Sequence, residues 1–209
     1  MFVIIRSILC VIFLIIGLFI IRKLTINKKR SLYVICVIII IFLGSISNLF
    51  PIENKFITFA SPESAFNYMN FGNVNDIVSG KNTDMVIATK GDLQVYSIIP
   101  KTNEGWKISV GLNTKKIIKK FYENITIYVY QYKNTEEYYI KILNKEGGRI
   151  EIVDNINSNF HCLIEKNNTL EKDFYTYIAY IHNFNNQYLL TVDGITISFS
   201  ENSNDISAS

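Results

Sequence analysis

Two long apolar runs near the N-terminus, residues 2–21 and 31–50, constrain the fold more than any other feature of this chain. The first run holds one charged residue, Arg6, and the second holds none. Each run matches the about 20 helical residues that span the hydrocarbon core of a bilayer. Lipid offers no hydrogen bonds to the backbone, so a spanning segment forms a helix. We therefore expect two transmembrane helices, with Arg6 reaching the interface through its long side chain.

A short basic hinge, residues 22–30, joins the two runs. It has no acidic residue, and its basic residues are Arg22, Lys23, Lys28, Lys29 and Arg30. Lysine and arginine concentrate in the short cytoplasmic loops of membrane proteins. We expect this hinge to set the topology in a cell membrane: the hinge inside against membrane lipid, both termini outside and the bulk of the chain extracytoplasmic. A cleaved signal peptide is the alternative for the first run, but the small-residue cleavage site that it requires is absent.

The rest of the chain is slightly acidic. The whole chain has 21 Lys and Arg against 18 Asp and Glu. Six of the basic residues and none of the acidic ones lie in residues 1–50, so residues 51–209 carry a net charge of −3. Proteins that bind nucleic acid concentrate basic residues on the folded domain. We therefore expect no nucleic-acid partner.

Residues 51–60 predict a connector, residues 61–199 a β-rich domain, and residues 200–209 a polar, disordered tail. Ser61 and Pro62 predict the start of one short helix, because serine caps helices and proline suits their first position. Alternation of apolar and polar residues then predicts strands. These strands span 75–78, 85–89, 94–100, 106–110, 125–132, 138–143, 149–153, 160–165, 174–184, 187–192 and 195–199.

Turn signals between these strands favour antiparallel pairing. The strongest is Asp193-Gly194, a pair suited to a two-residue hairpin turn. Residues 113–124 fit a helix by the spacing of their apolar residues, but their position between strands favours a strand with a bulge. The expected fold class is mainly β, as an antiparallel sandwich or a strongly curved sheet. One short helix and the two-helix transmembrane hairpin precede it.

These features resemble the small, uncharacterised membrane-anchored proteins of low-GC Gram-positive bacteria. The resemblance rests on the two N-terminal apolar runs and on three short segments. The segments are SPESAF at 61–66, GWK at 105–107 and NTEEYYIKI at 134–142. No activity is attached to that group, so the resemblance implies a location in the cell envelope and no function.

Residue types suited to catalysis are sparse. His161 and His182 lie within predicted strands, and Cys162 directly follows His161, so that their side chains point to opposite faces. A zinc site takes three or four ligands, which this pattern does not supply. The sequence contains no nucleophile-elbow, P-loop or metalloprotease motif. We therefore expect no enzyme, no catalytic residue, no metal site and no cofactor.

Tyrosines and lysines offer two candidate binding surfaces. Tyrosine combines an apolar ring with a polar tip and is enriched at interfaces, although half-buried sheets favour aromatic residues in any case. The candidate tyrosine face consists of Tyr128, Tyr130 and Tyr132 on one predicted strand and Tyr175 and Tyr177 on a later one. A lysine cluster suits either anionic lipid and cell-wall polymers or a merely solvated face. Its members are Lys115, Lys116, Lys119 and Lys120.

The leading functional hypothesis is a membrane-anchored, extracytoplasmic and non-catalytic module that binds another envelope protein or a cell-wall polymer. An alternative is an accessory or self-protection (immunity-like) subunit that acts through its membrane helices. A third is an envelope hydrolase whose site one sequence does not reveal.

Overall fold

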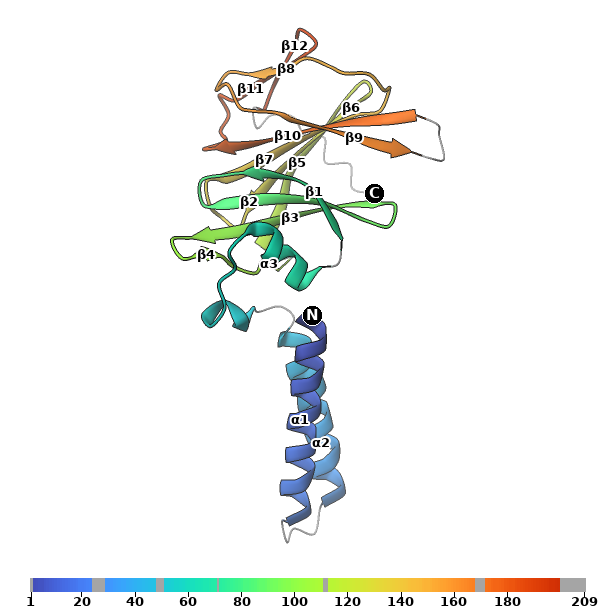
Figure 1. Ribbon diagram of the computed structural model, residues 1–209, viewed down its shortest axis with the longest axis vertical. Helices are drawn as coiled ribbons and strands as arrows, with labels where there is room; N and C mark the ends of the chain where they lie inside the picture. The colour runs from blue at the N-terminus through green and yellow to red at the C-terminus, as the bar shows by residue number, and fades with distance from the viewer. Residues whose placement is uncertain are drawn as a thin grey trace.

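The computed structural model describes residues 2–23, 29–47, 51–70, 72–110, 113–167 and 172–199. It is mostly β, as expected, and its strands pair antiparallel in three sheets that stack above a helical hairpin (Figure 1). The predicted tail, 200–209, lies outside the described residues.

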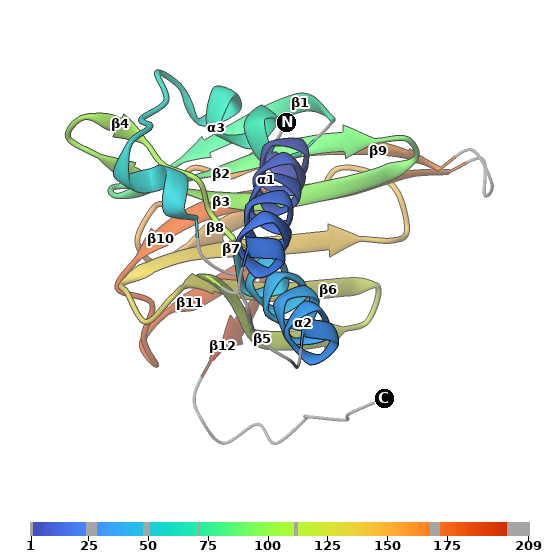
Figure 2. The same cartoon turned by 90° about the horizontal axis from the view of Figure 1, so that it is seen from below.

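The hairpin consists of α1 (Phe2–Lys23) and α2 (Lys29–Ser47), which lie side by side and project from the β domain (Figures 1 and 2). Small residues allow the two helices to approach closely. A Cβ atom added at Gly17 would lie 2.7 Å from the Cys36 sulfur, and one at Gly44 would lie 3.2 Å from the Cys10 sulfur. Outside this contact the hairpin exposes large apolar side chains, such as Phe13 at 62%.

These helices do not fit the predicted crossing of a membrane. Over the described part of the chain, no helix is both long enough and apolar enough to traverse a bilayer. The uncharged part of α1, from Ser7 to Ile21, extends about 22 Å at helical rise, and that of α2, from Ser31 to Ser47, about 26 Å. A bilayer core is about 30 Å thick. The predicted transmembrane hairpin, with its spans 2–21 and 31–50, is therefore wrong, and so is the cell-membrane location inferred from it.

Arg6 has a different role from the one predicted. Instead of reaching a membrane interface, its buried side chain binds Glu53 through two hydrogen bonds, from Nη2 to Oε2 at 2.6 Å and from Nε to Oε1 at 3.0 Å. Glu53 lies in a short 3-10 helix, η1 (Ile52–Lys55), within the predicted connector. Burial favours the neutral form of Glu53, but the hydrogen bonds and the charge of Arg6 hold its pKa below the usual value. This ion pair joins the first helix to the segment that leads into the β domain.

The predicted short helix is confirmed as α3 (Pro62–Met69). The hydroxyl of Ser61 accepts a hydrogen bond from the backbone N–H of Ser64 at 3.1 Å, which caps the helix. Ala65 and Phe66 are almost fully buried and face the first sheet. The helix therefore covers the outer face of that sheet (Figure 1).

The first sheet has the order β1-β2-β3-β4. Its strands are β1 (Asn73–Ser79), β2 (Thr83–Lys90), β3 (Leu93–Thr102) and β4 (Gly105–Trp106). The last strand is shorter than the predicted 106–110, because the side chain of Asn54 takes both backbone groups of Ile108. Asn54 Oδ1 accepts from Ile108 N at 2.7 Å, and Asn54 Nδ2 donates to Ile108 O at 2.8 Å.

The central sheet has the order β5-β6-β7-β10-β9. Its strands are β5 (Thr114–Tyr122), β6 (Ile125–Tyr132), β7 (Glu137–Asn144), β9 (His161–Asn167) and β10 (Lys172–His182). Residues 113–124 are thus mainly strand, and the expected bulge is present as a register shift between Lys116 and Ile118. The shift accommodates the pair Ile117-Ile118, which regular alternation would place on opposite faces.

A small third sheet has the order β12-β11-β8. Its strands are β8 (Ile152–Asp154), β11 (Leu189–Val192) and β12 (Ile195–Ser198). Asp193 and Gly194 connect β11 and β12 as predicted, and both have positive φ angles, of 47° and 81°. Two positive φ angles are typical of the turn that matches the twist of a hairpin.

Both faces of the central sheet are covered. Ile127, Val129 and Ile140 pack in a core with Leu190 and Val192 of the third sheet. The opposite face packs Tyr132, Tyr139 and Ile178 against Val78, Met85 and Ile98 of the first sheet. The predicted sandwich is thus a three-sheet stack, and the middle strands β6, β7 and β10 are buried on both sides.

Candidate functional site: the seam between the first and central sheets

Polar and titratable side chains gather where β1 and the β1–β2 turn pack against β7, β9 and β10. We call this region the seam. It contains two cavities, each of about 290 Å³. His161 lines the first cavity and His182 lines the second. The tight turn fits because residue 80 is glycine: an added Cβ would lie 2.7 Å from Tyr180 Cε2 and 2.8 Å from the Tyr139 hydroxyl.

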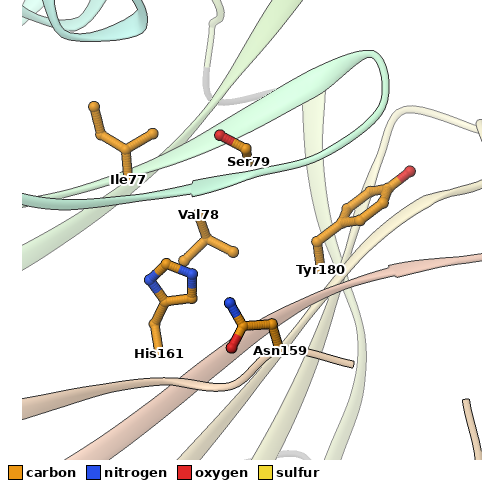
Figure 3. Close-up of a pocket in the computed structure, with 6 residues that line it drawn as sticks. All are labelled: Ile77, Val78, Ser79, Asn159, His161 and Tyr180. Carbon is orange, nitrogen blue, oxygen red and sulfur yellow. The ribbon is translucent and has the colours of Figure 1, made fainter. Parts of the chain in front are cut away.

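The first cavity, which we call the His161 cavity, is shown in Figure 3. It is lined by Ile77, Val78, Ser79, Asn159, His161 and Tyr180. Val78 points from β1 toward His161 and Asn159, whereas the Ile77 and Ser79 side chains point away on the other side of the strand (Figure 3). Ile77 and Ser79 therefore contribute mainly their backbone to the lining.

His161 is held across the seam by Asp76. The distance from His161 Nδ1 to Asp76 Oδ2 is 3.0 Å, and each side chain is about one-third exposed. A carboxylate only accepts hydrogen bonds, so the proton between them belongs to Nδ1. The other carboxylate oxygen of Asp76 accepts from the backbone N–H of Ile77 at 2.8 Å. The pair thus fixes the imidazole ring and leaves Nε2 as its remaining hydrogen-bonding atom.

The edge of β1 supplies backbone groups to the same cavity. β1 is the outer strand of its sheet. The N–H of Gly80 bonds to Thr83 O at 2.8 Å, toward β2. Because backbone groups alternate in direction along a strand, those of Ile77 and Ser79 point away from β2. The Ile77 carbonyl and both backbone groups of Ser79 are therefore available at the cavity edge.

A buried carboxylate, that of Glu137, binds the β1–β2 turn to the central sheet through hydrogen bonds. Glu137 is 2% exposed. It accepts hydrogen bonds from Asn82 N at 3.2 Å, Asn82 Nδ2 at 2.9 Å and Thr83 Oγ1 at 3.0 Å. The Tyr139 hydroxyl donates to Thr83 O at 2.8 Å. These bonds join β7 to the first residues of β2 and so fix how the two sheets meet.

Tyr180 lines the His161 cavity, and its hydroxyl lies 3.4 Å from Nδ1 of His182, which lines the second cavity. Its hydroxyl accepts a hydrogen bond from the Lys81 backbone N–H and donates one to the Glu137 carboxylate. Burial raises the pKa of Tyr180 to about 12, and the charge of Glu137 adds to this rise. The phenol therefore stays protonated at neutral pH, and its ring lines the His161 cavity.

The second cavity lies on the other side of the turn and is more highly charged. His182 lies between two groups, with Nδ1 3.4 Å from the Tyr180 hydroxyl and Nε2 3.7 Å from Glu136 Oε2. The lining residues are Lys81, Asn82, Thr83, Tyr132, Thr135, Glu136, Glu137 and His182. Within the described ranges, no three His, Cys, Asp or Glu residues are grouped closely enough to hold a metal ion.

The five candidate tyrosines do not share one face. Tyr128 pairs with Lys141, and Tyr130 and Tyr132 pack in the core beneath the first sheet. Tyr175 and Tyr177 lie on the opposite face, in the core beneath the third sheet. Tyr132 and Tyr177 are buried, at 7% and 6% exposure. The structure therefore divides four of the five tyrosines between two cores, whereas the half-buried Tyr128 belongs to neither core.

The basic residues predicted from sequence lie far from the seam. The lysine cluster lies on β5, an edge strand of the central sheet. Lys116 Nζ is 5.8 Å from the Tyr128 ring centre, and Lys120 Nζ donates to Ser198 O at 3.0 Å. Of the hinge residues, Arg22 and Lys23 lie in the last turn of α1, and Lys29 and Arg30 begin α2. Lys28 lies outside the described residues.

Sequence reasoning placed His161 and Cys162 on opposite faces, and the pairing confirms this: His161 pairs with Ile178, and Cys162 with Tyr177. It did not find Asp76 as the partner of His161, or Glu137 as a buried acceptor. The partners are 85 and about 55 residues apart in sequence. The one available signal was Glu137 itself, a carboxylate directly before the apolar, aromatic residues 138–140 of β7.

Comparison with known proteins gives no relative: no family model, no curated protein and no solved structure matches this chain. The resemblance to uncharacterised envelope proteins therefore stays a prediction.

Proposed function

We propose that this protein is a non-catalytic interaction module that associates with another protein through its helical hairpin. The observation that carries this proposal is the exposed apolar surface of α1 and α2. The exposed residues include Ile8, Val11, Phe13, Ile15 and Phe19 on α1 and Val34, Ile38 and Phe42 on α2. Exposed apolar surface on this scale marks an interaction surface.

The arrangement of the exposed residues supports a partner that surrounds the hairpin. Each helix covers one side of the other at the glycine contacts. The side chains at positions 11, 13, 15 and 19 of α1 point in several directions around the helix axis, and each is about half exposed or more. A helix that is apolar all round requires apolar neighbours all round. Helices of a partner protein, packed against both α1 and α2, would supply them.

Photo-cross-linking in the producing cells tests this proposal. A photoreactive phenylalanine analogue at Phe13 should cross-link to one defined partner protein, and an analogue at Phe42 should capture the same protein. The matched control is Phe121, which is 58% exposed on the β domain, against 62% for Phe13. Equal capture from Phe121, or cross-links from Phe13 to lipid alone, would contradict the proposal.

A further inference from the structure

We propose that the His161 cavity binds a small neutral ligand that carries hydroxyl and amide groups, of the class of an N-acetylated hexosamine. This site is distinct from the hairpin surface and does not depend on the function proposed for it. The inference rests on the juxtaposition of a fixed imidazole, a free strand edge, a side-chain amide and an aromatic wall (Figure 3).

The fixed imidazole supplies an oriented hydrogen-bond acceptor. Since Nδ1 of His161 donates to Asp76, the neutral ring presents its lone pair at Nε2. An acceptor of this kind suits a ligand hydroxyl. A carboxylate partner that fixes the ring also removes the rotational freedom that a free histidine would lose on binding.

The strand edge and Asn159 supply complementary donors and acceptors. The N–H and C=O of Ser79 point away from β2, as derived above from the Gly80–Thr83 hydrogen bond. Asn159 is exposed and directed at the cavity, and its amide both donates and accepts (Figure 3). An amide in the ligand would pair with a strand edge as a neighbouring strand does, N–H to C=O and C=O to N–H.

Charge and size narrow the class of ligand. The described lining of the cavity contains no lysine, arginine or glutamate, and the charged group that contacts His161 is the acidic Asp76. No cationic side chain of this lining would balance an anion, so a neutral ligand fits better than an anionic one. The volume of about 290 Å³ is close to the lower end of the range for ligand sites, which suits a single sugar ring. Val78 and the Tyr180 ring form an apolar wall for its C–H face.

The test measures the binding of N-acetylglucosamine to the purified full chain. Saturation-transfer NMR detects the binding, and calorimetry gives the dissociation constant. We expect binding in the millimolar range that weakens at least tenfold in His161→Ala, a change of about 1.4 kcal/mol. Asp76→Ala should weaken binding as well, because it removes the acceptor that orients the ring. His182→Ala is the matched control: it removes the histidine of the neighbouring cavity and should change the affinity less than about twofold. Circular dichroism verifies that each variant is folded, and His161→Gln provides a second variant at the same position.

Two results would overturn the proposal. One is the absence of N-acetylglucosamine binding to the folded wild-type chain at concentrations up to about 50 mM, well above the expected dissociation constant. The other is an affinity that does not change in folded His161→Ala or His161→Gln.

Discussion

The adjacent residues Glu136 and Glu137 offer a controlled test of how the seam holds the two sheets together. Glu137 is 2% exposed and accepts three hydrogen bonds from the start of β2 and the turn before it. The Glu136 side chain is 70% exposed and approaches His182 only to 3.7 Å. We predict that Glu137→Ala destabilises the fold strongly and that Glu136→Ala does not.

The magnitude follows from the donors that lose their acceptor. Thr83 is 1% exposed, so its hydroxyl cannot turn to water, and an unsatisfied buried donor costs about 1–3 kcal/mol. Asn82 is exposed, so water replaces the carboxylate there and each lost bond costs about 0.5–1 kcal/mol. The Tyr139 hydroxyl, 3.0 Å from Thr83 Oγ1, offsets part of the first loss. We therefore expect the free energy of unfolding to fall by about 3 kcal/mol in Glu137→Ala and by less than about 0.5 kcal/mol in Glu136→Ala.

Urea titration of the full chain measures this difference. Trp106, the single tryptophan, lies in the first sheet and its indole N–H donates to Asp84, so its fluorescence reports the loss of that sheet. Far-UV circular dichroism reports the loss of secondary structure over the whole chain. A loss below about 0.5 kcal/mol in Glu137→Ala, or equal losses in the two variants, would refute the role assigned to the buried carboxylate.

Three further predictions concern the turns, the junction and the seam. Gly80→Ala should lower the melting temperature more than Gly194→Ala does. A Cβ at Gly80 meets atoms at 2.6–2.8 Å, whereas a Cβ at Gly194 meets none and costs only about 1 kcal/mol of backbone strain. Arg6 holds the pKa of Glu53 below its usual value, so the Arg6–Glu53 ion pair should stabilise the junction of hairpin and β domain fully at pH values above that usual pKa. This stabilisation should be lost as the pH falls through the lowered pKa, which amide exchange in η1 measures. Glu53→Gln should remove this dependence of the exchange rate on pH. The pKa of Tyr180 is raised to about 12, so its contribution to the free energy of unfolding is present below its usual pKa of about 10 and is lost as the pH rises through about 12. In urea titrations at alkaline pH, Tyr180→Phe should lose less stability over this range than the wild-type chain does.

The strands of the β domain were largely predictable because their signals are local. Residues 125–132 alternate so regularly that the predicted strand matches β6 at both ends. The Asp193-Gly194 turn was equally clear, since few residue pairs accept two positive φ angles. The strand predicted at 106–110 was too long because its end is determined by Asn54, more than 50 residues earlier.

The seam was not predictable because its contacts are non-local. Alternation assigned Tyr128, Tyr130 and Tyr132 to one face of a strand, and the structure agrees. It could not show that a second sheet covers that face. In the same way, nothing near His161 in the sequence identifies Asp76, because the stacking of two sheets, and not strand periodicity, brings them together. The apolar runs correctly predicted two helices, but not the ion pair that places Arg6 against Glu53.

The lysines of β5 have a consequence for how copies of this protein meet one another. An edge strand leaves one row of backbone groups without a neighbour, and such a row can template aggregation. Two copies that joined along β5 would bring Lys115, Lys116, Lys119 and Lys120 of each chain together, and none of these forms an ion pair with a described carboxylate. Their mutual repulsion protects this edge, and the protection should weaken with salt, since the screening length falls from about 10 Å at 0.1 M to about 3 Å at 1 M.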